Sequence, residues 1–251
     1  MSSPLPAVLL GALLFVTGCA AGDDPRQAAA PADPAEAAQL EDFRRLAFGQ
    51  PGGQLAKWQR PLHIALVEAP GAEAREIARR HFADLAALSG LTVVESGPRD
   101  ANLLVFFADD PVESARRHRG LYSHRVTDAR QFETLLAERA DSTCFGFLWG
   151  GWPSGGGIDF ATVFVRTDRG ERTLQGCLVQ QTTQVLGLMH DLDPDADSIF
   201  SDSGRQTDLT PGDRLMIRLL YDPRLQPGMG WTEAEPLARA ALRDLSKGGG
   251  G

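Results

Sequence analysis

Apolar and polar positions along the chain predict a run of strands followed by a run of helices. Residues 58–67 alternate apolar and polar side chains, which predicts a strand with one buried face. Residues 72–88 carry apolar side chains at helical spacing and are followed by Ser89-Gly90, so we expect an amphipathic helix that ends there. The remaining expected strands are 91–95, 101–108, 145–149 and 158–165, and the remaining expected helices are 174–189, 213–221 and 232–245.

The order of these elements favours one fold class. Residues 101–108 are almost continuously apolar, as expected of an interior strand. Residues 111–141 mix charged and apolar side chains, which predicts a helical insertion with a solvated face. Because strands precede helices and the chain has no internal repeat, the sequence favours an α+β domain over a regular doubly wound sheet.

The N-terminal region differs from the rest of the chain. Residues 5–18 form an apolar run that is too short to span a bilayer, which takes roughly 20 residues, but has the length of a signal-peptide core. Residues 16–19, Val-Thr-Gly-Cys, resemble the bacterial lipobox, which implies cleavage after residue 18 and lipid attachment to the sulfur of Cys19. Ala20 after the cysteine implies sorting to the outer membrane. We therefore expect a chain that is lipid-anchored on the periplasmic side of the cell envelope.

Composition also sets the expected domain boundaries. Residues 19–40 contain almost no large apolar side chain and cannot bury much surface, so we expect a flexible tether after the signal peptide of residues 1–18. A single domain is expected over 41–245, including the insertion, and a flexible tail over 246–251.

The three cysteines divide into one lipidation site and one pair. With Cys19 lipidated, Cys144 and Cys177 remain in an oxidising compartment, where we expect them to form a disulfide. A bonded sulfur is not a nucleophile, so neither of these two residues is expected to be catalytic.

Net charge excludes one class of partner. The 251 residues contain 25 basic and 33 acidic side chains, which gives a formal charge of −8. Nucleic-acid binding requires a basic surface, so no nucleic-acid partner is expected. The same charge disfavours electrostatic binding to anionic lipid, so membrane contact is expected through the lipid anchor alone.

Residues 180–191, Gln-Gln-Thr-Thr-Gln-Val-Leu-Gly-Leu-Met-His-Asp, carry the clearest chemical signal. They resemble the metzincin protease motif His-Glu-x-x-His-x-x-Gly-x-x-His, in which two zinc ligands share a helix face and a glycine turn brings in the third. The chain keeps the glycine and the third histidine, His190. Gln180 and Gln184 stand where the first two histidines would be, and Gln181 stands where the catalytic glutamate would be. The resemblance implies a zincin-like mixed sheet with an active-site-type helix and C-terminal helices.

These replacements remove the chemistry of the motif. A glutamine amide is a poor zinc ligand, and Gln181 cannot accept a proton from a metal-bound water. We therefore expect no metal, no cofactor and no zinc-protease activity. Two interpretations remain: the glutamines only form hydrogen bonds within a packed helix and cleft, or they bind a peptide or glycan. The candidate cleft residues are Gln180, Gln181, Gln184, His190 and Asp191.

A second resemblance concerns a lipoprotein family. The chain is similar to a proteobacterial family of lipoproteins that carry a domain of unknown function, and this implies an envelope location without a known activity. The residues that carry this similarity are Cys177 and the segments 183–188, 198–200, 220–223 and 227–229. Segment 198–200, Ser-Ile-Phe, also lies where metzincins place their methionine turn.

Two points stay open at this level. The aspartates of residues 191–202 are spaced like those of a calcium-binding EF-hand loop, but Ala196 stands where that loop needs glycine, so either calcium binding or a solvated acidic loop is compatible with the sequence. For function, we favour a non-catalytic binding or envelope-structural module. The alternative is an envelope hydrolase that acts on a peptide or glycan through other cleft residues; a deep pocket with a strongly perturbed titratable group would favour it.

Overall fold

The computed structural model describes residues 33–69, 71–150, 157–201 and 203–248. The expected signal peptide, the expected lipidation site Cys19, the first part of the expected tether and residues 151–156 lie outside these ranges. Within them, none of the helices is both long and apolar enough to cross a membrane.

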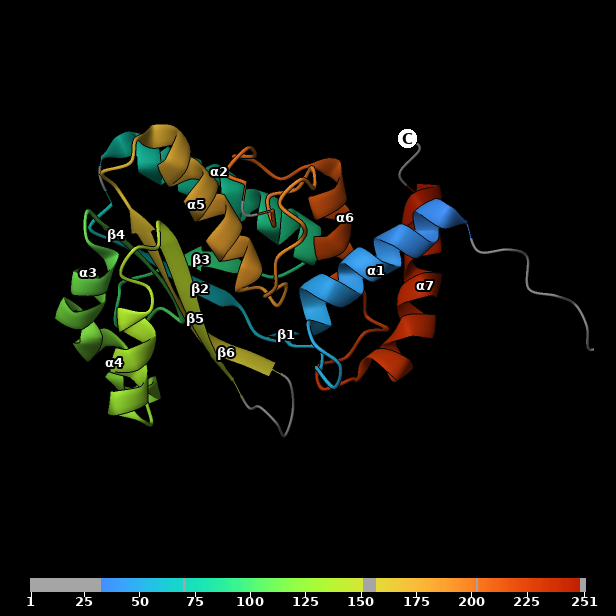
Figure 1. The fold of residues 1–251 in the computed structure, drawn as a ribbon, viewed down its shortest axis with the longest axis horizontal. Helices are drawn as coiled ribbons and strands as arrows, with labels where there is room; N and C mark the ends of the chain where they lie inside the picture. The colour runs from blue at the N-terminus through green and yellow to red at the C-terminus, as the bar shows by residue number, and fades with distance from the viewer. Residues whose placement is uncertain (1–32, 70, 151–156, 202, 249–251) are drawn as a thin grey trace, which may run out of the picture. The chain divides into compact units, whose positions relative to one another are not determined.

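A mixed β-sheet forms the centre of the described domain (Figure 1). Its strands are β1 (Lys57–Trp58), β2 (Leu62–Val67), β3 (Val93–Glu95), β4 (Leu103–Ala108), β5 (Cys144–Gly150) and β6 (Gly157–Arg166). They follow the order β1-β6-β4-β2-β3 with parallel neighbours, and β5 pairs antiparallel with β6. This mixed sheet with its helices fits the expected α+β class.

The expected strand over residues 58–67 is wrong in one respect, because it is two strands. Strand β1 pairs with β6, whereas β2 pairs with β3 and β4. Pro61, which has no N–H to donate to a ladder, stands between them. Strand β2 is also interior and is largely buried on both faces, so its alternation did not mark a solvent-facing side.

Helices cover both faces of the sheet. They are α1 (Pro34–Phe48), α2 (Ala72–Ser89), α3 (Pro111–Arg117), α4 (Ala129–Ala137), α5 (Glu171–Gln184), α6 (Pro211–Leu220) and α7 (Trp231–Gly248). Figure 1 shows α3 and α4 on one side of the strands and α2, α5 and α6 on the other. The sheet therefore separates two hydrophobic cores.

Side-chain alternation along the strands supplies both cores. On β4, Val105 belongs to the core beneath α2 and α5, and Phe106 belongs to the core beneath α3 and α4. On β6, Val163 and Phe164 divide in the same way. Because successive strand residues point to opposite faces, continuous apolar runs in β4 and β6 are what a sheet covered on both sides requires.

The expected insertion at 111–141 is confirmed as helical. It contains α3, two 3₁₀ turns and α4. Its charged face is exposed, and its apolar side chains face inward: Tyr122 and Phe132 are buried against the sheet, where Phe106 and Phe164 stack with ring centroids 4.7 Å apart. The insertion is thus the cover of the second core.

Helix α1 shows that the expected tether over residues 19–40 is wrong in its last part. The side chain of Asp33 accepts a hydrogen bond from the N–H of Ala35, which caps a helix that starts with Pro34. Phe43 is completely buried in the main core, and α1 packs against α7. Residues 34–40 therefore belong to the folded domain. The alanine-rich composition suggested a tether because few of these side chains are large enough to indicate burial.

Candidate functional site

Helix α5 supplies the glutamines and ends earlier than its sequence pattern suggests. The expected helix over residues 174–189 begins at Glu171 and ends at Gln184. After it, the chain turns at Gly187, which has a φ of +126°. A Cβ atom there would lie 2.0 Å from the carbonyl oxygen of Ala56, so glycine is required both by the backbone conformation and by the close approach.

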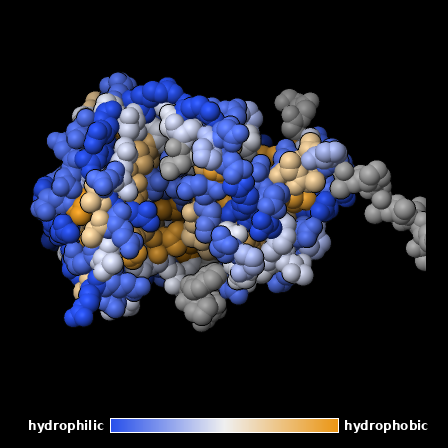
Figure 2. Space-filling model, in the orientation of Figure 1, coloured by the Kyte–Doolittle hydropathy of each residue, from blue (hydrophilic) through white to orange (hydrophobic). Residues whose placement is uncertain are grey.

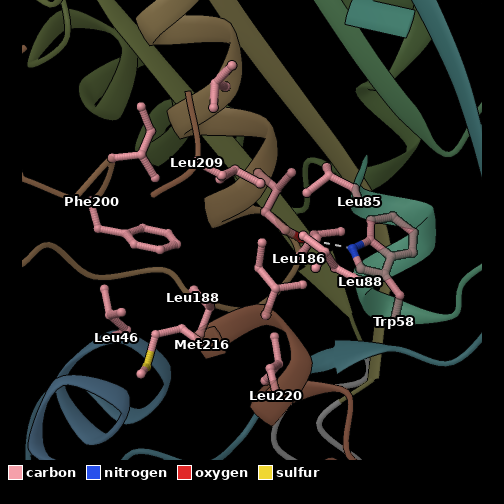
Figure 3. Packing of buried hydrophobic residues seen from close by; sticks show 14 of the residues in the cluster. Leu46, Trp58, Leu85, Leu88, Leu186, Leu188, Phe200, Leu209, Met216 and Leu220 are labelled. Carbon is pink, nitrogen blue, oxygen red and sulfur yellow. Dashed lines mark hydrogen bonds between the residues drawn. The ribbon is translucent and has the colours of Figure 1, made fainter. Parts of the chain in front are cut away.

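Two aromatic side chains donate hydrogen bonds to carbonyl groups at the end of α5 and in the turn that follows it. The indole N–H of Trp58 donates to the carbonyl oxygen of Val185 over 2.8 Å, and the hydroxyl of Tyr221 donates to that of Leu186 over 3.0 Å. Burial raises the pKa of Tyr221, so it remains a donor. Figure 3 shows Trp58 next to Leu186 within the buried cluster. The turn is therefore anchored in the core.

A cleft of about 550 Å³ lies between α5 and strand β5. It contains four of the five candidate residues, Gln180, Gln181, Gln184 and Asp191, and Met189 also lines it. The opposite wall comes from β5 and the segment that precedes it. The residues of that wall are Arg139, Asp141, Ser142, Thr143, Cys144, Phe145 and Gly146.

A chain of hydrogen bonds orders the polar wall. The amide N–H of Gln181 donates to Oε1 of Gln184 over 2.9 Å, and the amide of Gln184 donates to Oδ1 of Asp191 over 2.7 Å. Within the described residues, the side chain of Gln180 forms no such bond. This wall therefore presents a fixed pair of amides and a neighbouring amide that is available to a ligand.

Gly146 on β5 allows the two walls to approach each other. A Cβ atom there would lie 3.2 Å from the carbonyl oxygen of Thr162 and 3.4 Å from Oε1 of Gln181. A larger side chain would therefore press against α5 and narrow the cleft.

His190 does not join the glutamines. Its ring lies over Gly49 at the end of α1, where a Cβ atom would come within 2.3 Å of Nε2. It lines a neighbouring pocket of about 440 Å³ with Arg44 and Arg45, and Asp191 lines both pockets. His190, expected to be one of the candidate cleft residues, therefore does not line the cleft that contains Gln180 and Gln184. Helix α1, which composition had partly assigned to the tether, provides the surface to which His190 turns.

The expected disulfide between Cys144 and Cys177 is confirmed. Their Cα atoms are 5.7 Å apart, and the bond joins the start of β5 to α5 across 33 positions. It therefore fixes the strand wall of the cleft to the helix wall.

Strand β5 forms an edge of the sheet, since it pairs with β6 alone among the described strands. The N–H of Arg166 donates to the carbonyl oxygen of Thr143. Because hydrogen-bonded pairs alternate along an antiparallel ladder, the backbone groups of Cys144, Gly146 and Leu148 face the open side. In the view of Figure 2, apolar residues gather in the middle of the molecule, where Figure 1 shows β5 and β6. The cleft thus borders an unpaired strand edge.

The model of the family described as "Protein of unknown function (DUF2927)" matches residues 37–240. The protein belongs to the DUF2927 family. The match starts within α1 and ends within α7, so both helices are part of the DUF2927 domain. No curated protein matches the chain.

The acidic loop of the DUF2927 domain is held by arginine. Arg45 forms a bidentate ion pair with Asp193 at 2.8 and 2.9 Å, and this pairing lowers the pKa of Asp193. Arg205 donates to the carbonyl oxygens of Pro194 and Ala196. Across the described residues, no group of three or more His, Cys, Asp or Glu side chains is arranged to hold a metal ion.

Asp213 is a buried structural residue that the sequence did not single out. It accepts hydrogen bonds from the hydroxyl of Ser198 and the N–H of Ile199, and it completes a capping box with Thr210 at the start of α6. The Thr-x-x-Asp spacing was the available signal for the cap. The contact with the 198–200 segment required the tertiary structure.

His81 is the second residue that sequence reasoning missed. It is buried on α2, and burial lowers its pKa to about 4. Its Nε2 lies 3.3 Å from the hydroxyl oxygen of Thr183, and that hydroxyl donates to the carbonyl oxygen of Val179. The hydroxyl is therefore the acceptor, and neutral His81 donates from Nε2. It connects α2 to α5 behind the cleft rather than inside it.

Proposed function

We propose that this DUF2927 protein is a non-catalytic binding domain, lipid-anchored on the periplasmic side of the outer membrane, that holds an extended peptide in the glutamine-lined cleft. The observation that carries the proposal is the position of an unpaired strand edge directly beside a row of glutamine amides.

The peptide is favoured over a glycan by the backbone of β5. An exposed strand edge pairs with an extended chain through main-chain hydrogen bonds, which is a frequent mode of peptide recognition. Outward-facing groups of Gly146 and Leu148 would supply this pairing, and Gln180 would bond the peptide backbone from the other wall. Each glutamine amide both donates and accepts, as a peptide bond requires.

A degenerate metzincin-like fold is the architecture that we propose for this cleft. The supporting features are the mixed sheet, the helix α5 that follows its last strand, and the glycine turn at Gly187. Zinc does not fit the residues present, because Gln180 and Gln184 offer amides and His190 lines another pocket. No catalytic step is therefore assigned to this site.

The alternative hydrolase receives little support from the described titratable groups. The histidine with the strongly lowered pKa, His81, lines a different pocket and bonds Thr183. Gln181, at the position of a metzincin base, is an amide already bonded to Gln184.

Lipid anchoring is tested by replacing Cys19 with Ala. The variant should accumulate as an uncleaved precursor or leave the membrane fraction, whereas wild type should incorporate labelled fatty acid. A processed, membrane-bound C19A protein would refute the anchor without touching the cleft.

Peptide binding is tested by selecting from a displayed library of random ten-residue peptides on the full chain. Leu148→Pro removes an N–H that would donate to the peptide, so selected peptides should bind at least tenfold more weakly. The fold should persist, because proline is tolerated on an edge strand whose N–H faces solvent. Gln180→Ala should also weaken them. Gln175→Ala is the matched control, because Gln175 lies on the same helix but bonds Asp208 in another pocket. Equal binding by wild type, L148P and Q180A would contradict the proposal.

A further inference from the structure

Another pocket lies at the opposite edge of the sheet, beside α2. It has a volume of about 250 Å³ and lies between α2 and strands β2 and β3. Strand β3 is only three residues long and pairs with Leu62–Ile64, so the later part of β2 has no partner from β3. The pocket lies where this end of the sheet is incomplete.

Most of the walls of this pocket are apolar. Ile64 and Leu66 project from one face of β2, and two alanines on α2 leave room above them. The apolar lining residues are Ile64, Leu66, Phe82, Ala83, Ala86 and Val93. An apolar cavity of roughly 150 Å³ is already large enough to bind benzene, so this one is large enough for a ligand.

The basic residues of the pocket lie in one half of its α2 wall. Along α2, residues 75, 79, 83 and 86 follow helical i, i+4 and i+3 spacing, so they form one stripe. Its N-terminal half consists of Arg75 and Arg79, and its C-terminal half consists of alanines. Arg79 is paired with Glu76, whereas Arg75 forms no ion pair with a described residue. Glu95 contributes a single opposing carboxylate.

We propose that this pocket binds a single-chain anionic amphiphile, with a carboxylate head between Arg75 and Arg79 and an alkyl tail beneath Ala83 and Ala86. Arg79 is already paired with Glu76, but the guanidinium of Arg75 has no ion pair with a described residue, and guanidinium binds carboxylate strongly, so Arg75 is the group that favours an anion. A volume of about 250 Å³ is larger than the roughly 150 Å³ cavity that binds benzene, so the pocket has room for a medium-length alkyl tail. The ligand is therefore a medium-chain fatty acid. This site is separate from the peptide cleft.

Calorimetric titration of the full chain with hexanoate, octanoate and decanoate, below their micelle concentrations, tests the chain length. Affinity should rise about fourfold for each added methylene until the pocket is full, because each buried methylene contributes about 0.8 kcal/mol. Decyltrimethylammonium, with the same tail and a cationic head, should bind at least tenfold more weakly than decanoate. Absence of saturable decanoate binding, or equal binding of the cationic amphiphile, would overturn the proposal.

Two pairs of variants locate the ligand. Ala86→Phe fills the pocket and should reduce decanoate affinity at least tenfold, whereas Ala87→Phe adds the same group at an exposed position of α2 that does not line the pocket. Replacing both Arg75 and Arg79 with Gln should weaken decanoate about tenfold but leave decanol nearly unchanged. Arg80→Gln, on the same helix but outside the pocket, is its control.

The remaining outcomes also decide the question. Thermal unfolding of each variant identifies loss of fold, and the charge variants, which alter only exposed side chains, keep the test valid if A86F unfolds. Equal decanoate binding by A86F and A87F, both folded, would refute the site. Sedimentation that reveals a dimer dissociated by A86F, without decanoate binding, would assign the pocket to a second copy of the chain instead.

Discussion

The two ends of the sheet differ in how they could receive a ligand. At one end, the seven-residue strand β5 offers unpaired backbone groups beside polar glutamines, and a disulfide fixes it to α5. At the other, the three-residue strand β3 stops short and leaves an apolar pocket beneath α2 with arginines at one end. The first end favours directional hydrogen bonds, and the second favours apolar volume and charge. One sheet thus ends in two unlike surfaces, and its two edge strands differ in length.

The largest effect is expected at Gly187. Gly187→Ala places a Cβ atom against the carbonyl of Ala56 at a positive φ, so it should lower the free energy of unfolding by roughly 3–5 kcal/mol. Urea denaturation measures the loss. If the variant folds, the peptide cleft should be altered while decanoate binding persists. A loss below about 1 kcal/mol would show that the turn is not held as tightly as described.

Removal of the disulfide should destabilise the β5 edge of the sheet more than the β3 edge. Replacing Cys144 and Cys177 with serine should lower the free energy of unfolding by about 3–4 kcal/mol, as expected for a closed loop of this length in the chain-entropy model. Amide hydrogen exchange should increase in β5 more than in β3. Uniform exchange across both strands would argue against a local role for the bond, and reduction of the wild type provides an independent comparison.

His81 on α2 bonds Thr183 on α5, so protonation of His81 at low pH should lower the free energy of unfolding of the domain. Its pKa of about 4 lies below the usual value near 6.5, so its stabilising contribution is complete above pH 6.5 and is lost as pH falls from 6.5 towards 4. The difference corresponds to about 3 kcal/mol at most. His81→Gln should remove this part of the pH dependence measured by denaturation. The same slope in H81Q and wild type would exclude His81 as its source.

The smallest effect concerns the segment 198–200 and its contact with Asp213. Asp213→Asn should lower the free energy of unfolding by about 2 kcal/mol, since it weakens charge-assisted bonds to Ser198 and Ile199. Thr210→Ala removes only the helix cap and should cost about 1 kcal/mol. Thermal unfolding compares them. Equal losses would indicate that Asp213 acts through the cap alone.

Several elements followed from sequence because their signals are local. The helix over 72–88 ends at Gly90, which adopts a left-handed conformation, and α6 begins with proline after a threonine cap. The apolar run of β4 correctly indicated an interior strand. The disulfide was predicted from the oxidising location that the lipobox implies, and its geometry agrees.

Helix α1 and the direction of His190 were not predictable in the same way. Alanine-rich residues 34–40 carry little apolar surface, and their helix is fixed by packing of Phe43 and by ion pairs from Glu36 to Arg239 and Arg243. Those partners are about 200 positions away in sequence. The ring of His190 turned towards that helix, which the motif alone did not include.

The sequence by itself indicated most of the elements and the cysteine pair, because each depends on residue type and short spacing. Only the tertiary structure decided which candidate residues share a cleft, that His81 is buried and neutral, and that the sheet ends in an apolar pocket. These properties depend on contacts between distant segments, and burial, strand-edge exposure and pocket volume exist only once those segments have packed.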